Sequence, residues 1–271
     1  MRQLRQPRIA EIIAGSLRDD ILGGRLKEGD LLPKLEDLLK QFRASMPAVR
    51  EAMRILETDG LITVRRGNVG GAVVHLPTPG RAAQITSMVL QSRDATLNDV
   101  SAALLQIEPI CARMCAARPD RLTEVMPDLR AVIEKQWAEF DEVGCYNNNA
   151  RLFHETLVAK CGNETMIVVV GSLEAIWSAH ESSVWDEAEV REGPSDSAMA
   201  SKTLRAAIRD HEKILAVIEA GNEERAGTLS ARHLTAARQS TLASSSRTGI
   251  TANLLSQLEM LPVRQTVRLG S

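Results

Sequence analysis

Residues 44–74 read ASMPAVREAMRILETDGLITVRRGNVGGAVV, and their order decides the fold of the first part of the chain. Ser45 and Pro47 predict the start of a helix, because serine caps free backbone N–H groups and proline is tolerated in the first turn. One apolar stripe at helical spacing follows, made of Val49, Ala52, Met53 and Leu56. Gly60 predicts the end of this helix, and a short β-branched strand comes after it.

A basic, glycine-rich turn separates that strand from a second strand at residues 72–75. The turn is Arg65-Arg66-Gly67-Asn68-Val69-Gly70-Gly71. Upstream, apolar periodicity predicts helices at residues 8–22 and 35–42, which are joined by a turn. Two short helices, a capped recognition helix and a hairpin with a cationic tip are typical of a winged helix-turn-helix that binds DNA. The alternative is an ordinary helix and hairpin in a small α+β domain, and the order of the features favours DNA binding.

The length and charge of the chain fit a soluble protein of two domains. It has 271 residues, of which 44% are hydrophobic and 25% are charged. Residues 1–80 carry a net charge of +3 and the remaining residues −5, so the positive part is the one with the DNA-binding pattern. We find no secretory signal and no uninterrupted apolar run that could span a membrane, which predicts a cytoplasmic location. Four cysteines are too few for a disulfide framework. Cys111 and Cys115, one helical turn apart, are expected to be buried small residues rather than a metal or redox site.

Residues 8–76 resemble the GntR family of transcription regulators. The likeness lies in Gly29-Asp30, Leu32-Pro33, the run Val49–Glu57 and Gly60-Leu61-Ile62. The resemblance implies that Arg50 holds the operator, that residues 45–48 meet base edges and that residues 67–71 approach the minor groove. The DNA-binding residues expected on this basis are Lys34, Ser45, Met46, Pro47, Ala48, Arg50, Arg54, Arg65, Arg66, Gly67, Asn68 and Gly70. The sequence departs from the family at Leu35, Glu36 and Met46, so we expect an unusual operator.

No strand pattern occurs after residue 76. Residues 77–96 are expected to form a linker and a connecting helix, and residues 97–242 an all-α antiparallel bundle for effector binding and dimerisation. The remaining residues, 243–271, are expected to form a mobile tail. Within the bundle, periodicity predicts helices at 97–118, 122–143, 146–161, 165–190, 203–220 and 223–242, with a polar loop at 192–201.

Three histidines of the bundle can be placed relative to one another. His211 and His233 lie ten and eleven residues from the turn at Gly221-Asn222, so in an antiparallel helix pair they are level. His154 lies in the middle of its helix and can face them. Three converging imidazoles suit a divalent metal such as Zn²⁺ or Ni²⁺, although each histidine taken singly is more often a satisfied core or surface residue. His75 and His180 are expected to be solvated or capping residues.

Residues 97–242 resemble the FCD-type effector domain of many GntR regulators. The likeness lies in Glu108-Pro109, Phe153-His154, His211-Glu212 and His233-Leu234. The resemblance implies a metal that helps to hold a small carboxylate effector, in a pocket that includes Leu104, Glu108, Asn149 and Ala150. Ala150 stands where the family has a metal-binding aspartate, and Leu104 where it often has an arginine. Two alternatives follow: a three-histidine metal site, or a metal-free apolar pocket for a larger ligand.

The leading hypothesis is a homodimeric regulator, expected to be a repressor, that binds double-stranded operator DNA and responds to a small molecule. A metal-dependent enzyme is a second class, but we find no general base beside the histidines. A scaffold that binds protein through its winged helix is a third class.

Overall fold

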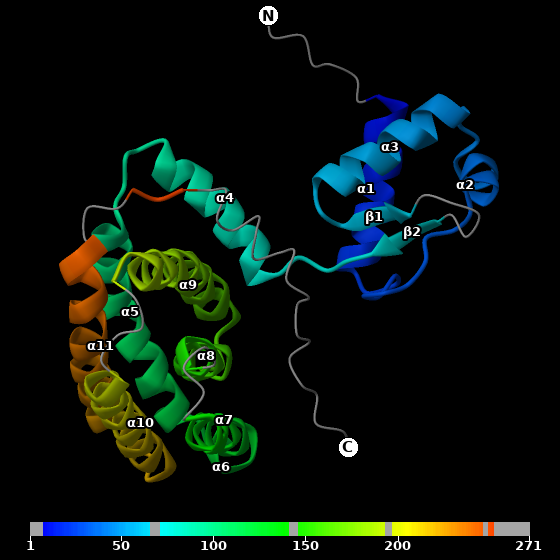
Figure 1. Ribbon diagram of the computed structural model, residues 1–271. Helices are drawn as coiled ribbons and strands as arrows, with labels where there is room; N and C mark the ends of the chain where they lie inside the picture. Colours follow the sequence, from blue (N-terminus) through cyan, green and yellow to red (C-terminus); the bar gives the residue numbers. More distant parts are fainter. Residues whose placement is uncertain (1–7, 66–70, 141–145, 193–196, 246–248, 252–271) are drawn as a thin grey trace, which may run out of the picture. The chain divides into compact units, whose positions relative to one another are not determined.

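The computed structural model describes residues 8–65, 71–140, 146–192, 197–245 and 249–251 (Figure 1). Within these ranges, the side chains at 146–150, 181–192, 197–204 and 240–245 are not described. The chain divides into two compact units, Met1–Thr78 and Pro79–Ser271. The predicted fold class is confirmed: a winged helix-turn-helix precedes a helical domain.

The first unit contains three helices and a hairpin. They are α1 (Ile9–Leu22), α2 (Leu35–Phe42), α3 (Met46–Thr58), β1 (Ile62–Arg65) and β2 (Gly71–Val74). The two strands pair antiparallel, in a register that runs from Ile62 opposite Val74 to Arg65 opposite Gly71. Each helix buries its apolar stripe in one core, which contains Ile13, Leu17, Ile21, Leu38, Val49, Ala52, Leu56, Ile62 and Val74.

The turn before α2 pairs with β2, which the sequence did not predict. Leu31 bridges Val73, and the N–H of Val74 donates to the carbonyl of Asp30 at 2.8 Å. Gly29 makes this return possible, because its φ of +84° lies in the left-handed region that favours glycine. The wing is therefore fixed to the segment that leads into α2.

The second unit is a bundle around one central helix. Its elements are α4 (Pro79–Gln91), α5 (Leu97–Ala117), α6 (Arg121–Glu124), α7 (Met126–Ala138), α8 (Tyr146–Ala159), α9 (Glu164–Glu192), α10 (Ser197–Glu219) and α11 (Glu223–Ser245). In Figure 1, α5 runs between α11 on one side and α8 and α9 on the other, and it packs against all three. By length and hydropathy α5 could cross a membrane, but half of its apolar window is buried, as expected for the core helix of a bundle.

Several boundaries differ from the predictions. The helix predicted at 122–143 is split into α6 and α7, because Pro127 in the first turn of α7 has no N–H to continue the earlier helix. The predicted polar loop at 192–201 is shorter, since α10 begins at Ser197. The connecting helix α4 packs on α9, where the Ser172 hydroxyl donates to the carbonyl of Pro79 at 3.1 Å.

Residues 243–245 and 249–251 are the described parts of the segment that is predicted to form a mobile tail. Helix α11 continues to Ser245, and Ile250 is buried in the core of the second unit. The N–H of Ile250 donates to the carbonyl of Ala95 at 3.0 Å, and the N–H of Thr251 donates to His180 Nε2 at 2.9 Å. The prediction of a solvated or capping His180 is therefore wrong, because this side chain is fully buried and accepts a tail hydrogen bond.

Candidate functional site

The outward face of α3 carries the residues expected to meet DNA. Ser45, Met46, Pro47, Arg50 and Arg54 are exposed, whereas the stripe that includes Val49 and Leu56 is buried. Ser45 occupies the N-cap position but its hydroxyl caps no backbone N–H, so it is available to a ligand. Arg54 lies 3.6 Å from Glu51 in an exposed pair, which competes weakly with other partners.

Other elements of the first unit also carry exposed cations. Lys34 at the N-cap of α2 and Arg65 at the end of β1 are exposed, and Ala48 is half-buried. Within the described parts of the chain, the side chains of Lys34, Arg50 and Arg65 have no ion pair. The other expected wing contacts, Arg66, Gly67, Asn68 and Gly70, lie outside the described residues.

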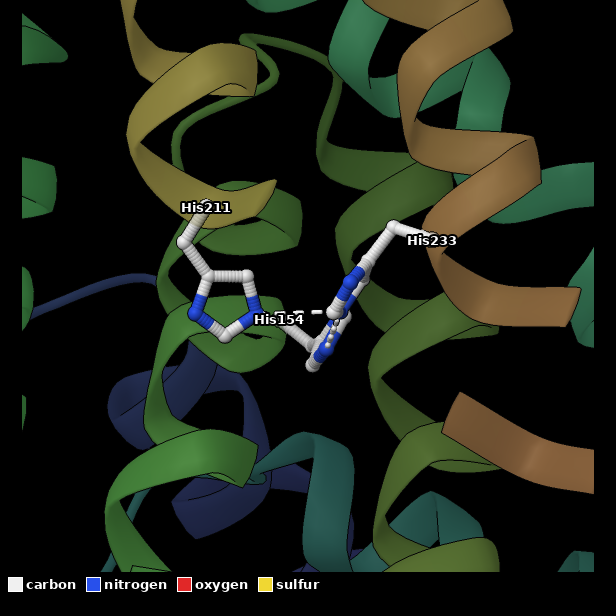
Figure 2. Close-up of side chains that lie close together, drawn as sticks. All are labelled: His154, His211 and His233. Atoms are coloured by element: carbon white, nitrogen blue, oxygen red, sulfur yellow. Dashed lines mark hydrogen bonds between the residues drawn. The ribbon is translucent and has the colours of Figure 1, made fainter. Parts of the chain in front are cut away.

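The three histidines predicted to converge do so inside the helical unit. His154 projects from α8, His211 from α10 and His233 from α11, as Figure 2 shows. The Nε2 atoms of His211 and His233 are 3.0 Å apart, and those of His233 and His154 are 3.3 Å apart. His211 and His233 are buried, and His154 is nearly so.

Hydrogen bonds orient two of these rings. His154 Nδ1 lies 2.6 Å from Oε1 of Glu108, and His211 Nδ1 lies 3.0 Å from Oε1 of Gln136. When each Nδ1–H donates to its oxygen, the Nε2 lone pair of that ring points into the cluster. Phe153 stacks on His211 at a centroid separation of 3.9 Å, which further holds the ring.

Two of the histidines, His211 and His233, have a lowered pKa and are neutral at physiological pH. Burial, followed by the charges of the neighbouring histidines, lowers the pKa of His211 well below its usual range. The same causes, burial and then His154, lower the pKa of His233 to about 3. A neutral imidazole is the form that binds metals.

The cluster fits a divalent metal. Two nitrogens that each lie about 2.0–2.1 Å from a tetrahedral Zn²⁺ are roughly 3.3 Å apart, close to the separations found here. The lone pairs of His154 and His211 both face His233 Nε2, and a single proton on that atom can satisfy only one of them. A cation would satisfy all three nitrogens, so the donor set and its spacing are compatible with a bound metal.

A buried charged network lies behind His154. The second oxygen of Glu108 accepts from Arg238 at 3.2 Å, and Arg238 also donates to Glu174 at 2.7 Å. Burial, followed by the charge of Glu108, raises the pKa of Glu174 to about 8, so Glu174 is protonated and shares its proton with Glu108. The Arg238 guanidinium lies 4.9 Å from the centre of the Trp177 ring.

Sequence reasoning missed Glu174, Arg238 and Gln136. A signal existed for Glu174, because it interrupts an otherwise apolar run, residues 166–177, in which a charge needs a buried partner. Of the expected pocket residues, Leu104 is fully buried and Glu108 uses its oxygens on His154 and Arg238. The side chains of Asn149 and Ala150 lie outside the described residues.

Cys111, Cys115 and His75 have structural roles. Cys111 and Cys115 are fully buried, as expected, and the thiol of Cys115 donates to the carbonyl of Leu157 at 3.2 Å. Burial raises the pKa of Cys115 to about 12, which makes it unreactive. His75 bridges Glu28 and Thr63, at 3.0 Å each, beside the end of the first unit.

A winged helix-turn-helix with an exposed cationic recognition helix, followed by a helical bundle, is the architecture of a DNA-binding regulator. Comparison with known families agrees with this class. Residues 9–73 match the family described as bacterial regulatory proteins, gntR family, and residues 99–236 match the FCD domain. The chain therefore belongs to the gntR family of bacterial transcription regulators and carries an FCD domain. The matching family description is that of bacterial regulatory proteins and not of an enzyme.

Solved structures and curated relatives resemble different portions of the chain. A GntR protein of Streptococcus agalactiae superposes with a TM-score of 0.65 at 19% identity, covering 85% of this chain and 99% of its own. The HTH-type transcriptional regulator Mce2R of Mycobacterium tuberculosis and the HTH-type regulator Mb0601 of Mycobacterium bovis are each 36% identical over 61 residues. These 61 residues make up 22% of this chain and 25% of the length of each relative.

Proposed function

We propose that this regulator binds operator DNA as a homodimer in the cytoplasm and that a small-molecule effector controls this binding. In the proposal, residues 1–76 bind DNA, residues 77–96 connect, and residues 97–242 bind the effector and dimerise. A homodimer is the state that reads two symmetric half-sites. The main support for an effector site in the helical unit is that the Nε2 atoms of His154, His211 and His233 converge there.

The DNA-binding part of the proposal is supported by exposed cations of the first unit that have no ion pair among the described residues. Arg50 stands one turn into α3 on its exposed side and has no ion pair among the described residues. In this proposal it contacts the operator, and Arg65 contacts a phosphate from the wing. The apolar Met46, 43% exposed, can contact a thymine methyl group.

Arg50→Ala tests DNA binding directly. Because Arg50 is exposed and makes no contact that stabilises the fold, we expect unchanged thermal stability and loss of the retarded operator band in a mobility-shift assay. The operator is first obtained by selection from random DNA with the wild-type protein. Arg25→Ala is the matched control, since Arg25 is an exposed arginine of the same unit that is paired with Asp20. Normal retardation by Arg50→Ala would refute the proposed role of α3.

The effector site is proposed to hold a divalent metal through His154, His211 and His233. Such a cation would supply positive charge and coordination positions open to an effector or to water. Glu108 would orient His154 and increase its basicity, and Gln136 would orient His211. Leu104 and the rest of the buried core exclude bulk water from the site.

Elemental analysis of the purified protein tests the metal. We expect about one Zn²⁺ or Ni²⁺ per chain, and loss of this metal in the triple variant His154→Ala, His211→Ala, His233→Ala. The matched control is His75→Ala, which removes a histidine outside the cluster. A wild-type protein without stoichiometric metal would refute the metal site, and the effector would then occupy a metal-free, largely apolar pocket.

A further inference from the structure

Arg43 adopts a backbone conformation that its residue type avoids. It lies at the C-cap of α2, in the turn that leads to α3, with φ 47° and ψ 42°. In the described chain, the non-glycine residues with positive φ are Arg43 and Asp94. Aspartate visits the left-handed region comparatively readily, whereas arginine there suffers a clash between Cβ and the backbone that glycine would avoid.

The side chain of Arg43 makes no contact in its own unit that would offset the energetic cost of this backbone conformation. It is exposed, and among the described residues it makes no hydrogen bond, ion pair or ring contact. The two backbone bonds of the turn, from the N–H of Arg43 to Lys40 and from the N–H of Ala44 to Leu39, would be formed equally by glycine. The fold therefore gives no reason for an arginine at this position.

The position of Arg43 offers another reason. Arg43 lies two positions before Ser45, the N-cap of α3, so its Cα is within about 7 Å of the start of the helix that presents Met46 and Arg50 outward. A DNA duplex that meets this end of α3 carries a phosphate charge about every 1.7 Å along its axis. A free guanidinium beside the helix start is thus within reach of the phosphates that flank the bases α3 contacts.

We propose that Arg43 binds a DNA phosphate next to the N-terminus of α3 and that this contact is why the strained turn carries an arginine. The inference rests on the proposed operator binding. It makes Arg43 a positioning residue: a phosphate contact fixes the register of α3 on the duplex and adds affinity without sequence preference. Replacing Arg43 with glycine should therefore change two quantities in opposite directions: it should increase the stability of the first unit and decrease its affinity for DNA.

Arg43→Gly separates the two effects. Glycine relieves the backbone clash but makes the unfolded chain more flexible, so we expect the melting temperature of the first unit to rise by roughly 2–6 °C. Operator affinity should fall by roughly threefold to tenfold, and the slope of log K against log salt should become shallower by about 0.9, the loss of one phosphate contact. The weakening should be equal on specific and non-specific DNA, because no base contact is lost.

Two further variants complete the experiment. Arg43→Lys keeps both the charge and the strained conformation, so it should retain the wild-type salt slope and melting temperature. Asp94→Gly relaxes the other positive-φ residue, in the helical unit, and should leave DNA affinity unchanged. If the wild-type protein binds its selected operator and Arg43→Gly binds it with the same affinity and salt slope, the inference is wrong while operator binding stands. If Arg43→Gly melts at a lower temperature, its strain premise is wrong. If the wild-type protein binds no DNA, the proposed function itself fails.

Discussion

Glu174 is a neutral carboxylic acid inside the helical unit, and its neutrality makes stability depend on pH. Burial and the charge of Glu108 raise its pKa to about 8, from the 4.5 that is usual for glutamate. Between these values the folded protein binds more protons than the unfolded chain, so the contribution of Glu174 to stability decreases as pH rises. His233 acts in the opposite sense: its pKa is lowered to about 3, so its contribution is lost as pH falls from 6.5 towards 3.

We predict that the metal-free protein becomes less stable between pH 6.5 and 8. Glu174 titrates in this window and contributes a slope of up to about 1.4 kcal/mol per pH unit. Glu174→Gln should flatten this part of the profile and leave the loss of stability in acid, which comes from the buried histidines. Urea denaturation over a pH series, with a chelator present, measures both effects. Glu134→Gln, on an exposed glutamate of α7, is the control and should follow the wild type. A Glu174→Gln profile parallel to the wild-type profile from pH 6.5 to 8 would contradict the assignment.

The sequence predicted the three clustered histidines better than the residues around them. His211 and His233 flank one tight turn, so their level positions follow from helix geometry, and the mid-helix position of His154 completed the set. Their hydrogen-bond partners could not be found in this way. Gln136, which orients His211, comes from α7, and local periodicity gives no information on how far one helix is rotated or displaced against another. The three histidines and Glu108 were therefore predictable, and Gln136 was not.

At the scale of elements, the apolar stripes predicted the helices but not their interruptions. Residues 8–22 and 97–118 matched α1 and α5 closely, because long periodic stripes have one buried face. The break between α6 and α7 depends on one proline, Pro127. The pairing of Leu31 with Val73 and the return of the tail to Ala95 are contacts between distant segments, for which a local pattern carries no signal.

The segment Gly249–Thr251 should behave as part of the helical unit. Ile250 is only 3% exposed and packs in the main core, so Ile250→Ala removes a buried aliphatic side chain. We expect a loss of about 2–5 kcal/mol in the free energy of unfolding, measured by urea denaturation. Thr251→Ala is the matched control, because Thr251 is exposed and bonds His180 through its backbone N–H. Equal stability of the two variants would show that the docked tail contributes nothing to the fold.

At the scale of the whole molecule, each unit has a core of its own. The core of the first unit is built from α1, α2, α3 and the hairpin, and that of the second from α4 to α11 with Ile250. The proposed metal ligands all belong to the second unit. A ligand that binds only the folded form stabilises the unit that holds it, by about 2.7 kcal/mol at a hundred times its dissociation constant.

We therefore predict that metal raises one of two thermal transitions. At about a hundred times the dissociation constant, Zn²⁺ added to the metal-free protein should raise the melting temperature of the helical unit by roughly 5–10 °C in scanning calorimetry. The transition of the first unit should not move. The Leu56→Ala variant identifies which transition belongs to the first unit. It removes a fully buried leucine from the core of the first unit, so it should lower the melting temperature of that transition alone. The triple histidine variant should show no shift with metal. A metal-induced shift of similar size in both transitions would contradict a site whose effect is confined to the helical unit. That outcome would indicate that metal binding is coupled to the stability of the DNA-binding unit, even without DNA and effector.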